Sequence, residues 1–565
     1  MKKCIGKILA ILLSAACLLP VFSGCSGNRV TGNTEEIDPE RTQLYVHVYD
    51  GGFGTEYMYK IKERFEAAYA NESYEAGKTG VQVMIDKQKS STTLESVIES
   101  SPNDVFFVEL ANMPLLIDKG LLLDISDVVT EDLAEYGENE SIEGKMEKSQ
   151  QDYMSKDGKY YAIPHYEGFW GITYNVDLFE DNLLYFSADP KPGSNGFIVS
   201  KDEKRSAGPD GNFDTEYDNG LPATYEELYA LCDRMKTYMN ISPFGWTGQY
   251  ASYVNTSVAG AFWADYEGAD SLYQNWSFTG PSTTIVKDIT ADGKVILEED
   301  VTINSSKGYL TYRQVGKYYA LTVLEKIIDS GWTSKNSFIT TQSNLMAQSD
   351  YLRSGIEPGA EKIAFYCDGS WWPRESTSVF NDLAELYPTK NTSQKDRRIA
   401  WFPLPKADSS KVDEKITMVD GLWSTCFIKS NIEEFKIDLA KEFLRFCNTD
   451  ESLQEFTTTT NATKALDYDL TQEQYESLSY YGKSLWNIVS QADIVRPYST
   501  NPIFLNYAGT FFWGDQWDST PPSGTYNYPS AAMNDDKVSA IDYFKGMMTN
   551  YSESKWRDRY SQYFD

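Results

Sequence analysis

Carboxylates and tryptophans follow several predicted strands, at positions where loops begin. Asp50 follows the apolar run at 44–49, and Glu109 lies at the end of the run at 103–110. Carboxylates in such loops accept hydrogen bonds from hydroxyl groups, and tryptophan rings offer an apolar face. The loop tryptophans are Trp246, Trp371 and Trp372. This combination suits non-covalent binding of a ligand with apolar faces and polar rims, such as a sugar, while burial in the core is the alternative for each tryptophan.

The segment DGNFDTEYDNG places oxygen-bearing side chains at alternate positions, as a calcium loop does. Positions 1, 3, 5 and 9 of such a loop would be Asp210, Asn212, Asp214 and Asp218. However, Thr215 stands where an EF-hand has glycine, and Leu221 stands where it has glutamate. The pattern admits a structural calcium ion, and a solvated acidic turn is the alternative. No other cofactor is predicted.

Signatures of enzymatic chemistry are missing from the sequence. It contains only two histidines, His47 and His165, and neither sits in a recognisable triad. No CxxC pair, Cys/His cluster or nucleophile elbow occurs. We therefore expect that the protein is not an enzyme. The 83 acidic residues leave a glycosidase pair open as an alternative, since that chemistry needs only two carboxylates.

The N-terminal segment has the properties of an export signal. Three lysines precede an apolar run at 8–22, which is shorter than the ~20 residues of a membrane-spanning helix. The run ends in Phe22-Ser23-Gly24-Cys25, which resembles the lipobox of bacterial lipoproteins. This resemblance implies a signal peptide at 1–24, acylation of Cys25, and a cell-membrane protein facing outward. The polar residues of 25–42 are expected to form a flexible linker.

Composition excludes some partners. The chain carries 83 acidic and 51 basic side chains, a net charge of −32, which argues against nucleic acid and against a polybasic membrane surface. The chain also contains forty tyrosines, whose apolar rings and polar hydroxyls suit partly solvated surfaces. Such surfaces are compatible with sugar binding. Cys232 and Cys447 fall on apolar helix faces and are predicted to be buried thiols, whereas pairing of Cys367 with Cys426 stays open.

From residue 43 the hydrophobic pattern alternates between strands and helices. Continuous apolar runs at 44–49 and 103–110, and an alternating run at 80–85, predict strands. Helical spacing between them predicts parallel βαβ units with helices on both sheet faces. Residues 185–221 lack periodicity and are predicted to be a loop insertion.

Several blocks occur in the order seen in one known family. They include NDVFFVELANMPLLIDKGLLLDISDVV, DGKYYAIPHYEGFWGITYNVDLFED, LPATYEELYALCDRMK, KIAFYCDGSWW, IAWFPLPK and LAKEFLRFCNTDE. Together they resemble the extracellular solute-binding proteins of bacterial carbohydrate ABC importers, of the maltose-binding-protein type. The resemblance covers most of 43–465.

The resemblance implies a fold of two α/β lobes with a ligand cleft between them. The first lobe would comprise 43–166 and 421–485, and the second 167–420 and 486–565. Chain crossings near 164–170 and 420–424 would join the lobes. A monomer is expected.

The resemblance also implies ligand-contacting residues near these crossings. Trp371 and Trp372 occupy the place where the family often has a stacking tryptophan. The residues at the crossings are Glu167, Trp170, Asp420 and Trp423. The implied function is capture of an oligosaccharide and its delivery to permease subunits in the membrane. A cell-surface carbohydrate-active enzyme and a sugar or peptide sensor on the same scaffold remain alternatives.

Overall fold

The structure is a computed structural model of the whole chain. It describes residues 35–89, 95–213, 215, 218–520, 524–526 and 528–564. The predicted signal peptide, Cys25 and most of the predicted linker therefore lie outside the described residues. None of the helices in the described part of the chain has the length and apolar character that a membrane crossing demands.

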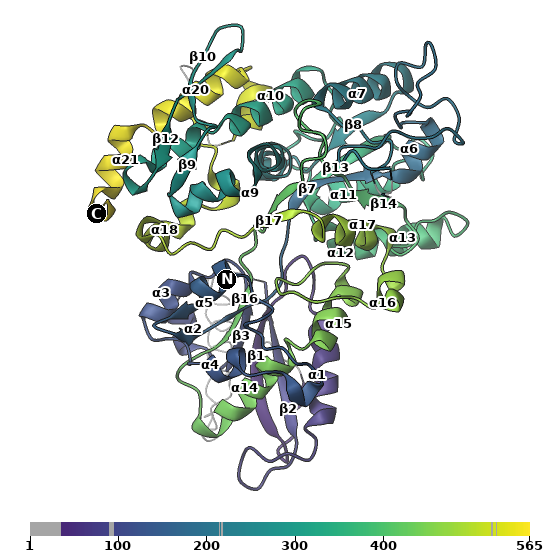
Figure 1. Cartoon of the computed structure of the whole chain (residues 1–565). Coiled ribbons are helices and arrows are strands. Elements are labelled where there is room, and N and C mark those ends of the chain that lie inside the picture. The colour runs from purple at the N-terminus through teal and green to yellow at the C-terminus, as the bar shows by residue number, and fades with distance from the viewer. Residues whose placement is uncertain are drawn as a thin grey trace, which may run out of the picture.

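The first lobe is built on a five-stranded sheet, at the bottom of Figure 1. Its strands, in spatial order, are β2 (Val81–Gln88), β1 (Thr42–Tyr49), β3 (Val105–Val108), β16 (Thr425–Ile428) and β6 (Ile163–Pro164). The β1 strand pairs in parallel with β2 and β3, as the βαβ pattern predicts, while β16 is antiparallel to its neighbours. The strands are buried because helices cover the sheet.

The helices of the first lobe come from two stretches of chain. They are α1 (Glu56–Ala68), α2 (Glu95–Ser100), α3 (Met113–Asp118), α4 (Ser126–Thr130), α5 (Lys148–Met154), α14 (Ile437–Phe446) and α15 (Asp450–Thr460). The α1 helix packs on α15 and β2. Its buried face contains Met58, Ile61 and Phe65, which recur at helical spacing.

The second lobe contains a four-stranded sheet with the order β14 (Ile399–Trp401), β7 (Trp170–Asn175), β13 (Ile363–Gly369) and β8 (Ser242–Gly245). Only β13 and β8 are parallel. The helices of this lobe include α6 (Val176–Asn182), α7 (Tyr225–Met239), α8 (Ala251–Val254), α9 (Ala261–Ser277), α10 (Val315–Asp329), α11 (Asn344–Arg353), α12 (Trp372–Glu375) and α13 (Thr377–Leu386). Two small antiparallel sheets pair β9 (Gly280–Ser282) with β12 (Val301–Ile303) and β10 (Val286–Ile289) with β11 (Val295–Leu297).

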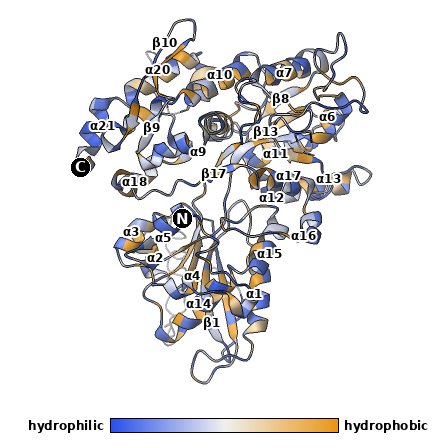
Figure 2. Ribbon diagram, in the orientation of Figure 1, coloured by the Kyte–Doolittle hydropathy of each residue, from blue (hydrophilic) through white to orange (hydrophobic). Residues whose placement is uncertain are grey.

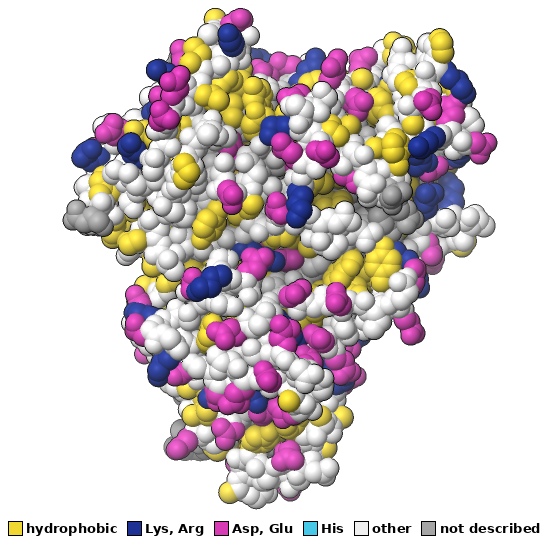
Figure 3. All heavy atoms as spheres, viewed as in Figure 1, with side chains coloured by type: hydrophobic (Ala, Val, Ile, Leu, Met, Phe, Trp, Pro, Cys, Tyr) yellow, Lys and Arg dark blue, Asp and Glu magenta, His cyan; other side chains and the backbone are white. Residues whose placement is uncertain are grey.

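The distribution of hydrophobic residues explains both cores. Hydrophobic residues occur along the strands of both sheets, and the helices carry hydrophobic and hydrophilic residues (Figure 2). In α7, Leu228, Cys232 and Met235 are fully buried, and the Thr224 side chain caps the helix by accepting from the Glu227 N–H at 3.3 Å. Acidic side chains are scattered over both lobes (Figure 3), as the net charge requires.

Between α6 and α7, the described residues form loops without a helix or a multi-residue strand, where the insertion at 185–221 is predicted. The four cysteines of the described residues are free and buried. Cys367 lies in the second-lobe sheet and Cys426 in the first-lobe sheet, so the two do not form a disulfide.

Three segments connect the lobes. The first runs from β6 to β7, and the second from β15 (Thr417–Val419) to β16. The third leads from α15 through α16 (Gln472–Ser477) to α17 (Tyr480–Val489), which packs on β14 of the second lobe. The chain therefore returns to the second lobe before Tyr480, and the boundary predicted at 485/486 falls inside α17. The reason is that Tyr481 and Leu485 form an apolar face that only the second-lobe core buries.

The C-terminal residues complete the second lobe. The strand β17 (Asp493–Val495) pairs with β15, and the last helices are α18 (Pro502–Tyr507), α19 (Pro529–Asp535), α20 (Ala540–Asn550) and α21 (Glu553–Tyr560). The α19 and α20 helices pack on α10, at the upper left of Figure 1.

Candidate functional site between the lobes

A cleft of about 590 Å³ separates the loops that follow strands in the two lobes. In the first lobe, β1 ends at Tyr49 and is followed by the glycine-rich turn at 50–54. In the second lobe, β13 ends at Gly369 and leads into α12. The cleft is lined by Tyr49, Asp50, Gly51, Gly52, Gly54, Glu56, Lys89, Asn344, Leu345, Gln348, Arg374, Glu375 and Thr377. Ligands of open α/β sheets bind at such strand ends.

The walls of the cleft are polar and carry both signs of charge. Asp50 pairs with Lys89 at 2.7 Å within the first lobe. Glu56 of the first lobe pairs with Arg374 of the second at 2.7 Å, so this ion pair spans the cleft. Partial burial, then the charges of nearby carboxylates, raise the pKa of Tyr49 to about 12. Tyr49 therefore stays neutral and can donate a hydrogen bond.

Aromatic rings form a series from the lobe interface to the surface. This aromatic row consists of Phe53, Trp371, Trp170, Tyr253 and Tyr250. Successive ring centroids lie 6.3, 4.8, 4.7 and 5.4 Å apart. The row begins at buried rings, since Trp371 is only 7% exposed, and ends at Tyr250, which is 43% exposed. Because Asn344 of the cleft donates to the Tyr253 hydroxyl at 3.3 Å, the row adjoins the polar cleft.

Three glycines make room for the Trp371 ring. A Cβ atom at Gly52 would lie 2.3 Å from Trp371 Cδ1, and one at Gly369 would lie 2.2 Å from Cζ2. At Gly168, on the first crossing, a Cβ atom would lie 3.2 Å from Cζ3. Trp371 is thus enclosed by backbone from both lobes and from a crossing. Position 52 is glycine because a side chain there would collide with Trp371.

The structure brings three of the predicted ligand-binding residues to the cleft region. Asp50 lines the cleft, and Trp170 and Trp371 belong to the aromatic row. Trp170 is the more accessible of the two rings, because it is partly exposed whereas Trp371 is buried.

Three other predicted tryptophans lie in the cores. Trp372 is fully buried and donates from Nε1 to Thr173 Oγ1 at 3.0 Å. Trp246 and Trp423 are 3% and 2% exposed. None of the three lines the cleft and each packs in a core in this structure, so their ligand contact stays a prediction. The hydrophobic effect favours burial of a tryptophan side chain wherever its loop packs against a core.

The predicted carboxylates Glu167 and Asp420 stabilise the segments that cross between the lobes. Glu167 is buried and pairs with Arg496 at 2.8 Å. Asp420 is also buried, and its Oδ1 accepts from the backbone N–H of Gly168 at 3.2 Å and of Leu422 at 3.1 Å. Burial, together with the charge of Glu167, raises the pKa of Asp420 to about 7. Both side chains hold crossing segments together and do not line the cleft of the strand-end loops.

Glu109 lies beneath the cleft. Its Oε1 accepts from the Tyr166 hydroxyl at 2.9 Å, and the residue is 7% exposed. Burial raises the pKa of this carboxyl to about 8, so Glu109 is mainly protonated at pH 7. It acts as a neutral hydrogen-bonding group near the first crossing.

Sequence reasoning missed most of the second-lobe side of the cleft. Arg374 and Glu375 follow the predicted tryptophan pair after Pro373, so a prediction that covered the next three residues would have included them. Tyr250 and Tyr253 follow the PFGWTG loop, whose tryptophan was predicted instead. Gln348 lies on α11 and hydrogen-bonds to Glu375 at 2.9 Å, a contact without a local signal.

The predicted calcium ligands lie together only in part. Asp210 Oδ1 accepts from the Asn212 N–H at 2.8 Å, and Asp218 accepts from the Thr215 hydroxyl, while Asp214 is outside the described residues. Burial and the charge of Asp210 raise the pKa of Asp218 to about 7. No group of three His, Cys, Asp or Glu side chains in the described part of the chain has a metal-site arrangement. A calcium site therefore stays a prediction.

Comparison with solved structures shows the fold. A chitin oligosaccharide binding protein superposes with a TM-score of 0.53 at 14% identity, over 91% of this chain and 98% of the other. The GacH receptor of Streptomyces glaucescens GLA.O, solved unliganded and with acarbose, gives a TM-score of 0.50 at 12% identity, over 93% and 99% of the two chains. No curated protein sequence matches the chain.

Family membership comes from the sequence itself. The sequence model of one family, described as "Bacterial extracellular solute-binding protein", matches residues 54–453. The match begins at the end of the first-lobe turn and includes the second-lobe side of the cleft and the first two crossings. The protein thus belongs to the bacterial extracellular solute-binding proteins.

Proposed function

We propose that the protein captures a carbohydrate in the cleft between its lobes. The observation that carries this proposal is the aromatic row beside a polar cleft. Sugar rings have apolar C–H faces, which pack on aromatic rings, and hydroxyl rims, which hydrogen-bond to carboxylates, amides and cationic groups. The row offers the rings of Trp170, Tyr253 and Tyr250, and the cleft offers Asp50, Gln348 and Arg374.

The ligand we propose is an oligosaccharide. The row contains several rings in succession and continues from the cleft to the exposed Tyr250, so it suits a ligand longer than one sugar unit. One structural neighbour is named for chitin oligosaccharides, and the other was solved with acarbose. These names agree with the proposed ligand class.

Delivery to a membrane permease completes the proposed function. A ligand that contacts both lobes stabilises the arrangement in which both sets of contacts form. A permease that recognises this arrangement would distinguish ligand-bound from ligand-free protein. Acyl chains on Cys25 would keep the monomer at the outer face of the cell membrane, because two or more chains anchor a protein stably. The proposal is binding without catalysis.

The test uses residues 26–565 on a glycan array, followed by calorimetry with each glycan that binds. Trp170→Ala should weaken binding by ~1–3 kcal/mol, which is ~5- to 150-fold in the dissociation constant, as for removal of an aromatic stacking platform. Trp371→Ala should also weaken binding, because the buried Trp371 ring packs against Trp170 and holds it in place. Tyr238→Ala serves as a control, because Tyr238 is 75% exposed on α7. Melting must be measured in parallel, since Trp371 is buried and its loss also destabilises the fold.

Two outcomes would contradict the proposal. If no glycan binds, or if a stably folded Trp170→Ala protein binds as tightly as the parent, the aromatic row is not a carbohydrate site. If glycan products appear in chromatography of the incubated mixture, the protein is a carbohydrate-active enzyme. A peptide ligand in place of a glycan would favour the sensor alternative.

A further inference from the structure

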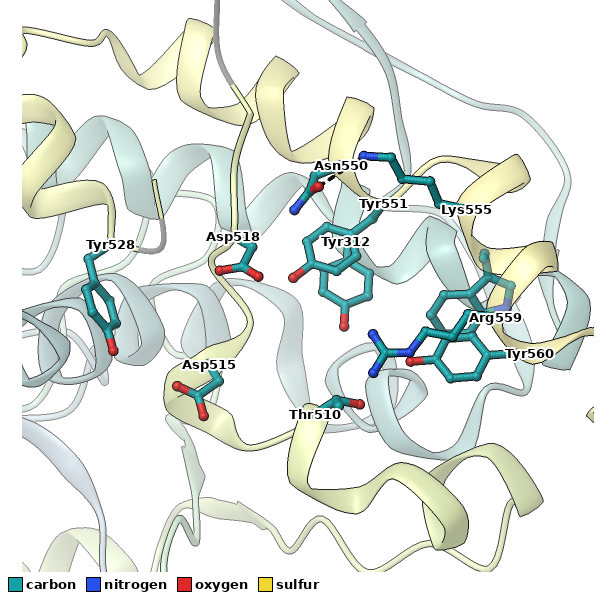
Figure 4. Close-up of a pocket in the computed structure, with 11 residues that line it drawn as sticks. Tyr312, Thr510, Asp515, Asp518, Tyr528, Asn550, Tyr551, Lys555, Arg559 and Tyr560 are labelled. Atoms are coloured by element: carbon teal, nitrogen blue, oxygen red, sulfur yellow. Dashed lines mark hydrogen bonds between the residues drawn. The ribbon is translucent and has the colours of Figure 1, made fainter. Parts of the chain in front are cut away.

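A second hollow lies in the C-terminal part of the second lobe, with a volume of about 500 Å³ (Figure 4). This C-terminal hollow is formed by the 3₁₀-helix at Ser305–Arg313, the loop after α18, and the helices α20 and α21. None of its lining residues lines the interlobe cleft. All of them except Tyr312 lie beyond residue 453, where the family match ends.

Fixed aromatic rings form one wall of the hollow. Tyr312 and Tyr551 stack with centroids 3.5 Å apart and an interplanar angle of 7°. Trp556 packs beside Tyr560 at 4.5 Å, and its Nε1 donates to the Ser305 carbonyl at 2.8 Å. Tyr312, Trp556 and Tyr560 are only 3%, 4% and 4% exposed, so they support the wall from behind, and Tyr551 is the ring that stays partly exposed to a ligand.

Charged groups without ionic partners face one another across the hollow. The carboxylates of Asp515 and Asp518 lie on one side, and the guanidinium of Arg559 points inward from the other (Figure 4). Within the described part of the chain, no ion pair involves any of these three groups. Partial burial and the charge of Asp515 raise the pKa of Asp518, with no compensating cation. Asp515 and Arg559 are exposed, and Arg559 also lies over the rings of Tyr507 and Tyr560, so a ligand would replace water at these groups.

We propose that the C-terminal hollow is a second ligand site, separate from the cleft, that binds a single saccharide unit. The carboxylates of Asp515 and Asp518 would accept hydrogen bonds from sugar hydroxyls, and Arg559 would donate to hydroxyl or ring oxygens. The hydroxyl groups of Tyr312 and Tyr551 lie between them (Figure 4). Charge-assisted hydrogen bonds of this kind are stronger than neutral ones.

The balance of charges favours a neutral hydroxyl-rich ligand. The hollow contains two carboxylates, Lys555 and Arg559, so it has no excess of positive charge to attract an anion. A simple cation would leave the guanidinium unpaired, and an apolar ligand would leave all four charges unpaired. A saccharide satisfies donors and acceptors on both walls and also covers the partly exposed Tyr551 ring.

The experiment counts binding sites by calorimetry on residues 26–565. The probes are glucose, N-acetylglucosamine, maltose and chitobiose, each titrated to millimolar concentration. We expect at least one probe to bind at a second site that Trp170→Ala leaves intact. Asp518→Asn and Arg559→Gln should each weaken that second site by about 10- to 100-fold, through loss of a charge-assisted hydrogen bond.

A matched control lies on the same helix. Arg557 pairs with Glu553 at 3.3 Å and does not line the hollow, so Arg557→Gln should leave both sites unchanged. Melting curves confirm that each variant is folded. A single site for every probe, or a second site that both hollow variants leave unaltered, overturns the proposal. Binding of glycine or of inorganic phosphate at Arg559, with no saccharide bound there, also overturns it. Because the cleft variant is measured separately, failure of this site is distinguishable from failure of the cleft.

Discussion

Replacement of Gly52 by alanine should push the two lobes apart. The added Cβ atom would lie 2.3 Å from Trp371 Cδ1 and 2.6 Å from Trp371 Cβ, whereas ordinary contacts begin at 3.4 Å. A rotation of the tryptophan side chain would relieve the first contact but not the second, because Cβ does not move with the rotamer. The turn of the first lobe and the loop of the second must therefore separate by about 1 Å or more.

The cost can be estimated from similar overpacked sites. Inserting a methyl group into a filled space costs ~1–3 kcal/mol, and here the strain is relieved when the lobes separate. A ligand that needs both lobes would have to overcome this cost, so its dissociation constant should rise by ~5- to 150-fold. The Glu56–Arg374 ion pair spans the same gap and is expected to break as well.

Small-angle scattering and calorimetry measure the two consequences. Gly52→Ala should increase the radius of gyration of the ligand-free protein and weaken sugar binding. The control is Gly509→Ala, where an added methyl group would meet nothing closer than 3.9 Å. If Gly52→Ala changes neither the radius nor the affinity while it melts like the parent protein, the lobes do not depend on this contact and the reasoning is wrong.

Three further predictions concern other parts of the chain. The pKa of Glu109 is about 8 in the folded protein, above the ~4.3 of an unfolded glutamate. The free energy of unfolding should therefore fall as the pH rises from ~4 to ~8, because the unfolded chain releases this proton first. Glu109→Gln should therefore lower the difference in thermal midpoint between pH 5 and pH 8, and an unchanged difference would show that folding does not raise the pKa of this carboxyl. Cys25→Ser should release the protein from membranes into the medium, whereas full retention in the membrane pellet would exclude a lipid anchor there. Calcium should raise the thermal midpoint if the loop containing Asp210 binds it, and Asp210→Asn should abolish the rise; equal midpoints in calcium and in chelator would exclude the site.

The local pattern of the sequence was enough to predict the layered fold. Runs such as Leu44–Tyr49 and the alternation after Gly80 predict strands, and the helical spacing of Met58, Ile61 and Phe65 predicts the covering helix. These features depend on neighbours within a few residues, so they are readable without the fold. Asp50 and its glycines were found for the same reason, because a carboxylate after a buried strand reaches the sheet edge.

The individual fate of each aromatic and charged residue was decided by tertiary structure. Trp371 and Trp372 are adjacent in sequence, yet one joins the aromatic row and the other is buried beside Thr173 in the second-lobe core. Glu167 and Arg496 lie far apart in the chain and meet only where the segments cross. Burial and ion pairing are set by long-range packing, which brings together residues that no local pattern relates. The sequence alone therefore determined the elements and the chemical types available, whereas the tertiary structure decided which of those residues reach the cleft.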